Sequence, residues 1–254
     1  MEPDKQLDAI RERIDAIDSR LLELISERAR CAQEVAEVKL AASQSSDTPP
    51  TFYRPEREAQ VLRAIQERNP GPLASDYVAS IFREIMSSCL ALEKPLSVAY
   101  LGPEGTYSQA AALKHFGQSA IPVGQLSIHK VFRQVESREC DYGVVPVENS
   151  TEGMVGQTLD SFLETPLQIT GEIELPVVHH LLGAASMQVD SVKLVLGHEQ
   201  ALAQCRQWLD SHLPDVPRET VASNGAAALR AAGETGVAAI AGDLAAQLHQ
   251  LTPL

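Results

Sequence analysis

The sequence has no excess of basic residues, no long apolar run and no apolar segment at its N-terminus. Its 254 residues carry 34 acidic and 21 basic side chains, a net charge of -13. No basic field is therefore available to gather the phosphates of a nucleic acid or of an anionic membrane. No stretch approaches the roughly 18 apolar residues needed to span a bilayer, and the N-terminus lacks an apolar signal segment. These absences predict a cytoplasmic protein without a nucleic-acid or membrane partner.

Paired cysteines are also missing. The four cysteines are scattered without a CxxC pair: Cys31, Cys89, Cys140 and Cys205. Histidines that could suggest a metal site or a general base lack carboxylate or cysteine partners at useful spacing: His179, His180 and His198. Neither a disulfide framework nor a metal site is indicated, and we expect reduced thiols and histidines that pack or form hydrogen bonds.

Glycine and proline are absent from residues 4–42, where apolar residues recur at helical spacing. This pattern predicts one long helix, which the small, polar, proline-containing segment 43–51 ends. Two further helices are predicted over residues 55–68 and 75–93. Three helices, the first very long, cannot close a core alone as a simple bundle. A homodimer that shares helices is the economical arrangement.

The composition changes at Lys94-Pro95, and short apolar runs then alternate with helical stretches. The runs lie at residues 97–101, 142–147, 167–173, 192–196, 220–222 and 237–240. This alternation is typical of an α/β domain with a largely parallel sheet.

Basic residues on the long helix form the first candidate site. Arg28 and Lys39 are eleven residues apart, so they project from one face about 16 Å apart along the axis. Side chains reaching inward from these positions could bracket a small dianion. Arg11 lies about 100° around the helix from Arg28 and could serve the pocket of a partner subunit. Solvated surface charge is the alternative interpretation of each of these residues.

Two glycine-containing turns form the second candidate site. GPEGTYS at residues 102–108 follows a predicted strand, and VPVENSTEG at residues 145–153 also joins a strand to a helix. Backbone N–H groups and hydroxyls in such turns can bind an anion at a helix N-terminus, at the edge of the sheet where α/β proteins bind ligands. Either turn alone could be a capped helix, and the two together favour a ligand cleft.

Residues 7–93 resemble the all-helical chorismate mutase family through LDAIRERIDAIDSRLLELISERARCAQEVAEVK, YRPEREAQVL and IFREIMSSCLALE. The resemblance implies conversion of chorismate to prephenate. The positions matching the family's substrate-holding groups are Arg11, Arg28, Lys39, Arg57, Glu58 and Glu93, with Cys89 where some relatives carry serine. This pericyclic rearrangement needs no nucleophile, metal or cofactor, since conformational restriction and charge stabilisation suffice.

Three of these positions are expected to be catalytic. Arg28, with the other arginines, would bind carboxylates and select the reactive conformer. Lys39 would donate to the breaking ether oxygen, where negative charge develops. Glu93 would be a second donor, which requires its protonated form. A solvated carboxylate at the end of a helix is the alternative interpretation of Glu93.

Residues 97–249 resemble prephenate dehydratase through AYLGPEGTYSQAA, GVVPVENSTEGMVGQTLD, LGHEQALAQCRQWL and AAIAGDLAA. The resemblance implies an α/β, two-lobed fold similar to type II periplasmic binding proteins. Prephenate would lie between the lobes and lose water and carbon dioxide to give phenylpyruvate. The residues expected to line this cleft are Thr106, Glu148, Asn149, Ser150, Thr151 and Gln204.

Together the resemblances imply a bifunctional enzyme of phenylalanine biosynthesis. We expect a mutase domain over residues 1–94 and a dehydratase domain over residues 95–254, with lobes near 95–170 and 171–254. Dehydratase family members continue past the position of Leu254 with a Thr-Arg-Phe motif, a segment that completes the first lobe and an effector-binding domain. Low or no dehydratase activity is therefore expected of this chain.

Two alternatives stay open at this point. In the first, the α/β half binds prephenate or a similar dicarboxylate without turning it over. In the second, the long amphipathic helix is only a dimerisation coil for the α/β half. A Lys39→Ala substitution separates the second alternative from a mutase, because a coil would keep its dimer and lose nothing else.

Overall fold

The computed structural model describes residues 2–43, 52–149 and 153–254. Their contacts divide the chain into two compact units. Unit 1 comprises Met1–Leu96 and Phe116–Ala120, and unit 2 comprises Ser97–His115 and Ile121–Leu254. No helix in the described ranges is long and apolar enough to cross a membrane.

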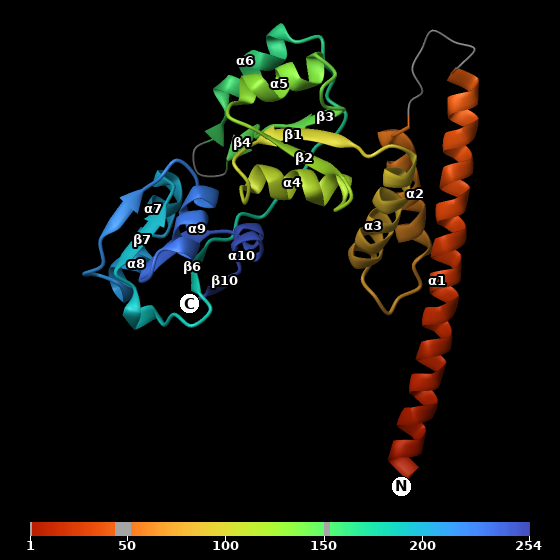
Figure 1. Cartoon of the computed structure of the whole chain (residues 1–254), viewed down its shortest axis with the longest axis horizontal. Coiled ribbons are helices and arrows are strands. Elements are labelled where there is room, and N and C mark those ends of the chain that lie inside the picture. Colours follow the sequence, from red (N-terminus) through yellow and green to blue (C-terminus); the bar gives the residue numbers. More distant parts are fainter. Residues whose placement is uncertain (1, 44–51, 150–152) are drawn as a thin grey trace. The chain divides into compact units, whose positions relative to one another are not determined.

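Unit 1 is built from helices. They are α1 (Glu2–Ser43), α2 (Pro55–Arg68) and α3 (Ser75–Glu93), and both α1 and α2 contact α3 (Figure 1). Pro55 opens α2 at a position where its missing N–H costs nothing. The three helices predicted from residue spacing are confirmed, and α2 and α3 have the predicted bounds.

The long helix leaves much of its apolar face uncovered within the chain. Six residues at helical spacing are each between 50% and 57% exposed: Leu7, Ile10, Ile14, Ile17, Leu21 and Leu24. Ala36, nearer the end of α1, is 7% exposed. Covering such a stripe would remove several hundred Å² of apolar surface from water, at roughly 25 cal/mol per Å². This stripe is therefore a strong candidate for a protein contact.

The first sheet of unit 2 is parallel, with strand order β2-β1-β3. Its strands are β1 (Ser97–Leu101), β2 (Ile121–Gln125) and β3 (Tyr142–Val144). Figure 1 shows α4 (Tyr107–Phe116) on one face, and α5 (Ile128–Glu136) with α6 (Gly156–Glu164) on the other. The central strand is apolar and covered on both faces, as parallel sheets require.

The second sheet is mixed, with order β10-β6-β9-β7-β8. Its strands are β6 (His180–Ala184), β7 (Leu194–Gly197), β8 (Arg218–Thr220), β9 (Val237–Ala241) and β10 (Leu251–Pro253). Strands β7, β8 and β9 run parallel, whereas β6 is antiparallel to both β9 and β10. All five residues of β9 are buried. The expectation of a largely parallel sheet is correct for the first sheet and wrong for the second.

Short helices follow the strands of the second sheet. They are η1 (Val189–Ser191), α7 (Glu199–Gln204), α8 (Arg206–His212), α9 (Asn224–Gly233) and α10 (Asp243–His249). The alanine-rich helix α9 packs against β9, and small side chains let the two backbones approach closely.

One predicted strand is wrong. The apolar run 167–173 contains no strand, and the whole stretch 165–179 lies outside helix and sheet. Pro166 and Pro176 remove two N–H groups from this stretch, and Ile169 is 71% exposed. Without a ladder partner or a buried face, apolar composition alone does not make a strand.

The loop after β1 approaches α9 so closely that Gly225 is required there. A Cβ at Gly225 would overlap the carbonyl oxygen of Glu104. Because a backbone atom cannot swing aside, we expect Gly225→Ala to lower the free energy of unfolding by about 1–3 kcal/mol in urea denaturation. Gly233→Ala, in the same helix with open space around its Cβ, is the matched control. Equal stabilities of the two variants would contradict this close approach.

Candidate functional site

Lys39 and Glu93, two predicted catalytic residues 54 positions apart, meet in unit 1. Lys39 Nζ donates to Glu93 Oε2 at 3.3 Å and to the carbonyl oxygen of Phe52 at 3.0 Å. It also lies 5.4 Å from the centre of the Phe52 ring. The two charged side chains are only 25% and 11% exposed, so their charges are less screened than a surface pair. In this pairing Glu93 is an acceptor, and its expected role as a donor stays a prediction.

Glu58 forms a second polar pair, between α2 and α3. Arg83 Nε lies 3.6 Å from Glu58 Oε1, and the Glu58 side chain is 17% exposed. Burial raises the pKa of Glu58, while hydrogen bonding to Tyr53 and the charge of Arg83 oppose that rise. The site therefore holds a carboxyl group that accepts a proton more easily than a solvated one.

The raised pKa of Glu58 makes the stability of unit 1 depend on pH. Between the ordinary value of 4.5 and the higher folded value, the folded protein binds more protons than the unfolded chain. The contribution of Glu58 to the free energy of unfolding therefore falls as pH rises through this window. We expect Glu58→Gln to stabilise the protein, relative to wild type, more at pH 7 than at pH 4 in thermal scans. Glu56→Gln, on an exposed residue of the same turn, is the control, and equal shifts at both pH values would argue against a raised pKa.

The other predicted mutase residues are not gathered around Lys39 by the chain alone. Arg28 and Arg57 are exposed. Arg11 is 71% exposed at its side chain and pairs with Asp8 at 3.1 Å. Cys89 is 4% exposed on α3. In the described ranges, no hydrogen bond or ion pair joins these residues to Lys39 or Glu93.

In unit 2 the predicted residue Thr106 is part of a rigid turn. Its hydroxyl donates to the carbonyl of Leu101 at 3.1 Å and accepts from the N–H of Gln109 at 3.4 Å. The Gln109 side chain, 5% exposed as a residue, in turn accepts from the N–H of Gly105 at 2.7 Å. These bonds cap α4 and fix the glycine-containing turn.

The second predicted turn is partly described. Glu148 and Asn149 form β4 (Glu148–Asn149), which pairs with β5 (Gly153–Met154). Ser150 and Thr151 lie outside the described residues. The segment lies between β3 and α6, as expected of a connection from a strand to a helix, and the short β4–β5 pair is an addition that the sequence did not predict.

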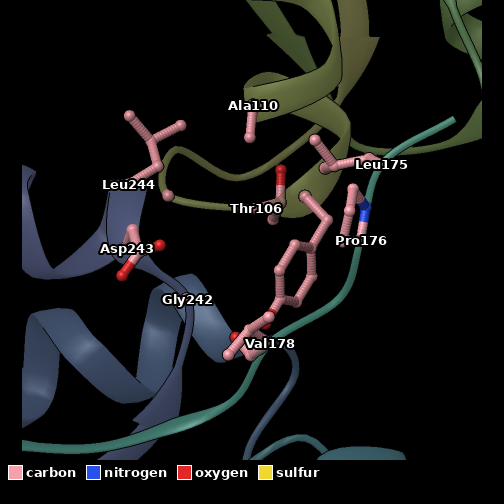
Figure 2. A pocket seen from close by; sticks show the side chains of 10 residues that line it. Thr106, Ala110, Leu175, Pro176, Val178, Gly242, Asp243 and Leu244 are labelled. Atoms are coloured by element: carbon pink, nitrogen blue, oxygen red, sulfur yellow. The ribbon is translucent and has the colours of Figure 1, made fainter. Parts of the chain in front are cut away.

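An open pocket lies beside the first turn of unit 2. Figure 2 shows Asp243 and Leu244 from α10 on one side, Leu175, Pro176 and Val178 on the other, and Thr106 between them. Among the predicted dehydratase residues, Thr106 lines this pocket, whereas Glu148, Asn149 and Gln204 do not.

Two adjacent histidines follow the pocket residue Val178, and they contact different helices: His179 contacts α4 and α7, and His180 contacts α10. His179 Nδ1 is 3.0 Å from the Tyr107 hydroxyl, and its Nε2 is 2.7 Å from Gln204 Oε1. His180 Nε2 is 3.0 Å from Asp243 Oδ1 without hydrogen-bond geometry. Burial raises the pKa of Tyr107, and the nearby Asp243 carboxylate raises it further, so the phenol stays neutral. In the described parts of the chain, no three His, Cys, Asp or Glu side chains are placed to hold a metal ion.

Comparison with known proteins identifies the family. The chorismate mutase type II family matches residues 10–94, and the prephenate dehydratase family matches residues 98–254. A bifunctional chorismate mutase/prephenate dehydratase from Stutzerimonas stutzeri is 58% identical over 98% of this chain and 68% of its own length. The corresponding protein from Pseudomonas aeruginosa is 57% identical over the same shares. The chain belongs to the bifunctional chorismate mutase/prephenate dehydratase family.

A solved structure agrees with this assignment. The prephenate dehydratase from Arthrobacter aurescens, solved in complex with L-Phe, aligns with a TM-score of 0.55 and 28% identity. The alignment covers 63% of this chain and 54% of that one. The expected fold class, an all-α mutase domain followed by an α/β dehydratase domain, is confirmed. Both the isomerase and the lyase domain of this family are present, and the chain spans about two thirds of the length of the curated relatives.

Several residues of the two sites were not predicted from sequence. Phe52 and Arg83 touch predicted mutase residues, and Tyr107 and His179 connect to a predicted dehydratase residue. Phe52 contributes its backbone carbonyl, which no sequence pattern reports. Tyr107 lies beside Thr106 in the GPEGTYS motif. Its place in this motif was the one sequence signal that could have marked it as a site residue.

Proposed function

We propose that unit 1 converts chorismate to prephenate without a cofactor. The observation that supports this most is the meeting of Lys39 and Glu93 in a poorly solvated corner between α1 and α3. An ammonium group has three N–H bonds, and in the described chain Lys39 uses two of them. The third can donate to the ether oxygen, where negative charge grows as the bond breaks.

The remaining residues hold the substrate in this proposal. Arg28 and Arg57 bind its carboxylates, and Glu58 accepts from its hydroxyl. In this proposal Cys89 lines the wall of the same substrate pocket. Purified chain incubated with chorismate tests the proposal, because ultraviolet absorbance follows chorismate loss directly. Unchanged absorbance would reject it.

We also propose that the active form is a homodimer through the α1 helices. The exposed stripe from Leu7 to Leu24 supports this, because one chain leaves it without cover. Arg11 lies among the stripe residues and would reach the pocket of the partner subunit. The limits of the mutase domain at residues 1–94 and a cytoplasmic location stay predictions.

For unit 2 we propose a prephenate site that includes Thr106, Glu148, Asn149, Ser150, Thr151 and Gln204. The position of Thr106 at the pocket and the exposed Gln204 amide support it. The reaction expected at such a site is loss of water and carbon dioxide to give phenylpyruvate, and binding without turnover is the alternative. Calorimetric titration with prephenate, together with an assay for phenylpyruvate, separates the two. Absence of both binding and product would reject the site.

A further inference from the structure

Glu58, the proposed acceptor for the substrate hydroxyl, is held by residues of two other segments. Arg83 on α3 places its Nε 3.6 Å from Glu58 Oε1, across the contact between α2 and α3. Tyr53, which precedes α2 and is 8% exposed, forms a side-chain hydrogen bond with the same carboxyl group. The Tyr53 ring packs edge to face against Phe116, with ring centres 5.8 Å apart. One carboxyl group is therefore fixed by two anchored partners.

Arg83 is placed to act on Glu58 rather than on solvent. The Arg83 side chain is 27% exposed, and its Nε is buried without a hydrogen bond in the described chain. A guanidinium group keeps its positive charge in proteins, so a buried one is costly unless a negative charge lies close to it. Glu58 supplies that charge, and limited exposure to water makes the attraction stronger than that of a surface pair.

This arrangement leaves Glu58 able to accept from a ligand. The two oxygens of a carboxylate offer about four acceptor positions, and Tyr53 and Arg83 together use only part of them. A carboxylate also accepts more strongly than a protonated carboxyl group, because its hydrogen bonds are charge-assisted. When it is held and ionised, Glu58 can therefore bind a hydroxyl group in one fixed direction.

We propose that Arg83 and Tyr53 are positioning residues of the mutase site, which hold Glu58 as an ionised acceptor for the hydroxyl of chorismate. This inference rests on the proposed chorismate mutase function of unit 1. In this role Arg83 and Tyr53 act through Glu58 and supply no group to the reacting atoms. The alternative is that the pair of Arg83 and Glu58 only fastens α2 to α3. Its loss would then lower stability without changing how activity depends on pH.

Opposing effects set the protonation of Glu58. Burial raises its pKa above 4.5, whereas the hydrogen bond to Tyr53 and the charge of Arg83 oppose that rise. The charged neighbours in the same turn, Glu56 and Arg57, are exposed to water. Without Arg83 the effect of burial would be less opposed, and the pKa of Glu58 would rise further. Activity would then require a higher pH, since the protonated group is the weaker acceptor.

The dependence of kcat/KM for chorismate on pH tests the proposal, because its acidic limb reports a group that must be ionised in the free enzyme. Arg83→Gln should move this limb up by about one pH unit, so that kcat/KM is about tenfold below wild type at about pH 5 and within about twofold of it at about pH 8. Arg83→Lys keeps the charge and should restore the wild-type limb. Arg63→Gln, on an exposed arginine of α2, is the matched control and should leave the profile unchanged.

Tyr53→Phe gives a second, milder test. It removes only the hydroxyl that bonds to Glu58, and it should move the acidic limb in the same direction as Arg83→Gln. This variant keeps the proposal testable if Arg83→Gln does not fold. An acidic limb that stays at its wild-type position in Tyr53→Phe would overturn the role of Tyr53.

The titration of the Glu58 carboxyl group can be followed separately by NMR in ¹³C-glutamate-labelled chain, with Glu58→Gln used for assignment. In Arg83→Gln we expect the pKa of Glu58 to lie about one unit above its wild-type value. An unchanged titration, or a loss of kcat/KM that is equal at every pH, would overturn the proposal and leave the pair as a fastener between helices. A wild-type chain that consumes no chorismate at any pH would reject the proposed function as well, whereas an active wild type with an unmoved limb in Arg83→Gln rejects this inference alone.

Discussion

Lys39→Ala is expected to lower kcat/KM for chorismate by about 10³-fold, or about 4 kcal/mol of transition-state stabilisation. The reason is that Lys39 is a preorganised donor, held by Glu93 and by the carbonyl of Phe52. Its charge is aimed at an oxygen that becomes negative only as the reaction proceeds. Most of the loss should appear in kcat, since that interaction strengthens in the transition state. Steady-state assays by chorismate absorbance measure it.

A matched control is available in the same helix. Lys5→Ala removes an exposed lysine from α1 and should leave kcat/KM within about twofold of wild type. Both variants should remain dimeric, because neither change touches the apolar stripe. If Lys39→Ala kept full activity, α1 would be only a dimerisation coil and the catalytic role of Lys39 would be wrong.

Ile14→Asp is expected to abolish the dimer and, with it, mutase activity. Ile14 lies in the middle of the exposed stripe of α1 and is 50% exposed in the single chain. Burying an unpaired carboxylate there costs several kcal/mol, and two-fold symmetry places two of them in the interface. Activity should fall at least about 100-fold at micromolar protein, since the monomer lacks the partner's Arg11. Analytical ultracentrifugation and the chorismate assay measure the two effects.

Ser19→Asp is the control for this substitution. Ser19 is five residues from Ile14, about 140° around the helix, and is exposed on another face. The Ser19→Asp substitution adds the same charge to the same helix, and it should leave both the dimer and the activity unchanged. A fully active Ile14→Asp monomer would show that the pocket is complete within one chain.

Unit 1 was largely predictable because its pattern is long and regular. Residues 4–42 contain no glycine or proline and repeat apolar residues at helical spacing, which predicts a single long helix. The proline at the start of 55–68 marks the first turn of the next helix. The convergence of Lys39 and Glu93 followed from the family resemblance. Helical spacing alone could not bring together residues on α1 and α3.

Unit 2 was less predictable because a short strand forms only where an adjacent strand supplies its hydrogen-bond partners. Strand β2 contains Pro122 and Gly124, and β10 ends in Pro253, so neither has a strand-like composition. Both form because β1 and β6 offer them ladder partners at the edge of a sheet. The apolar run 167–173 has the composition but no partner. The bond between His179 and Gln204 likewise depends on tertiary packing that spacing does not report.

The most direct test of the central proposal is the rate at which purified 254-residue chain consumes chorismate. Ultraviolet absorbance follows the substrate, and a parallel assay follows phenylpyruvate. A working site around Lys39 and Glu93 predicts saturable chorismate loss with prephenate as the first product, and the parallel assay reports whether unit 2 then turns it over. No chorismate loss by folded, dimeric protein would contradict the assignment of unit 1 as a chorismate mutase.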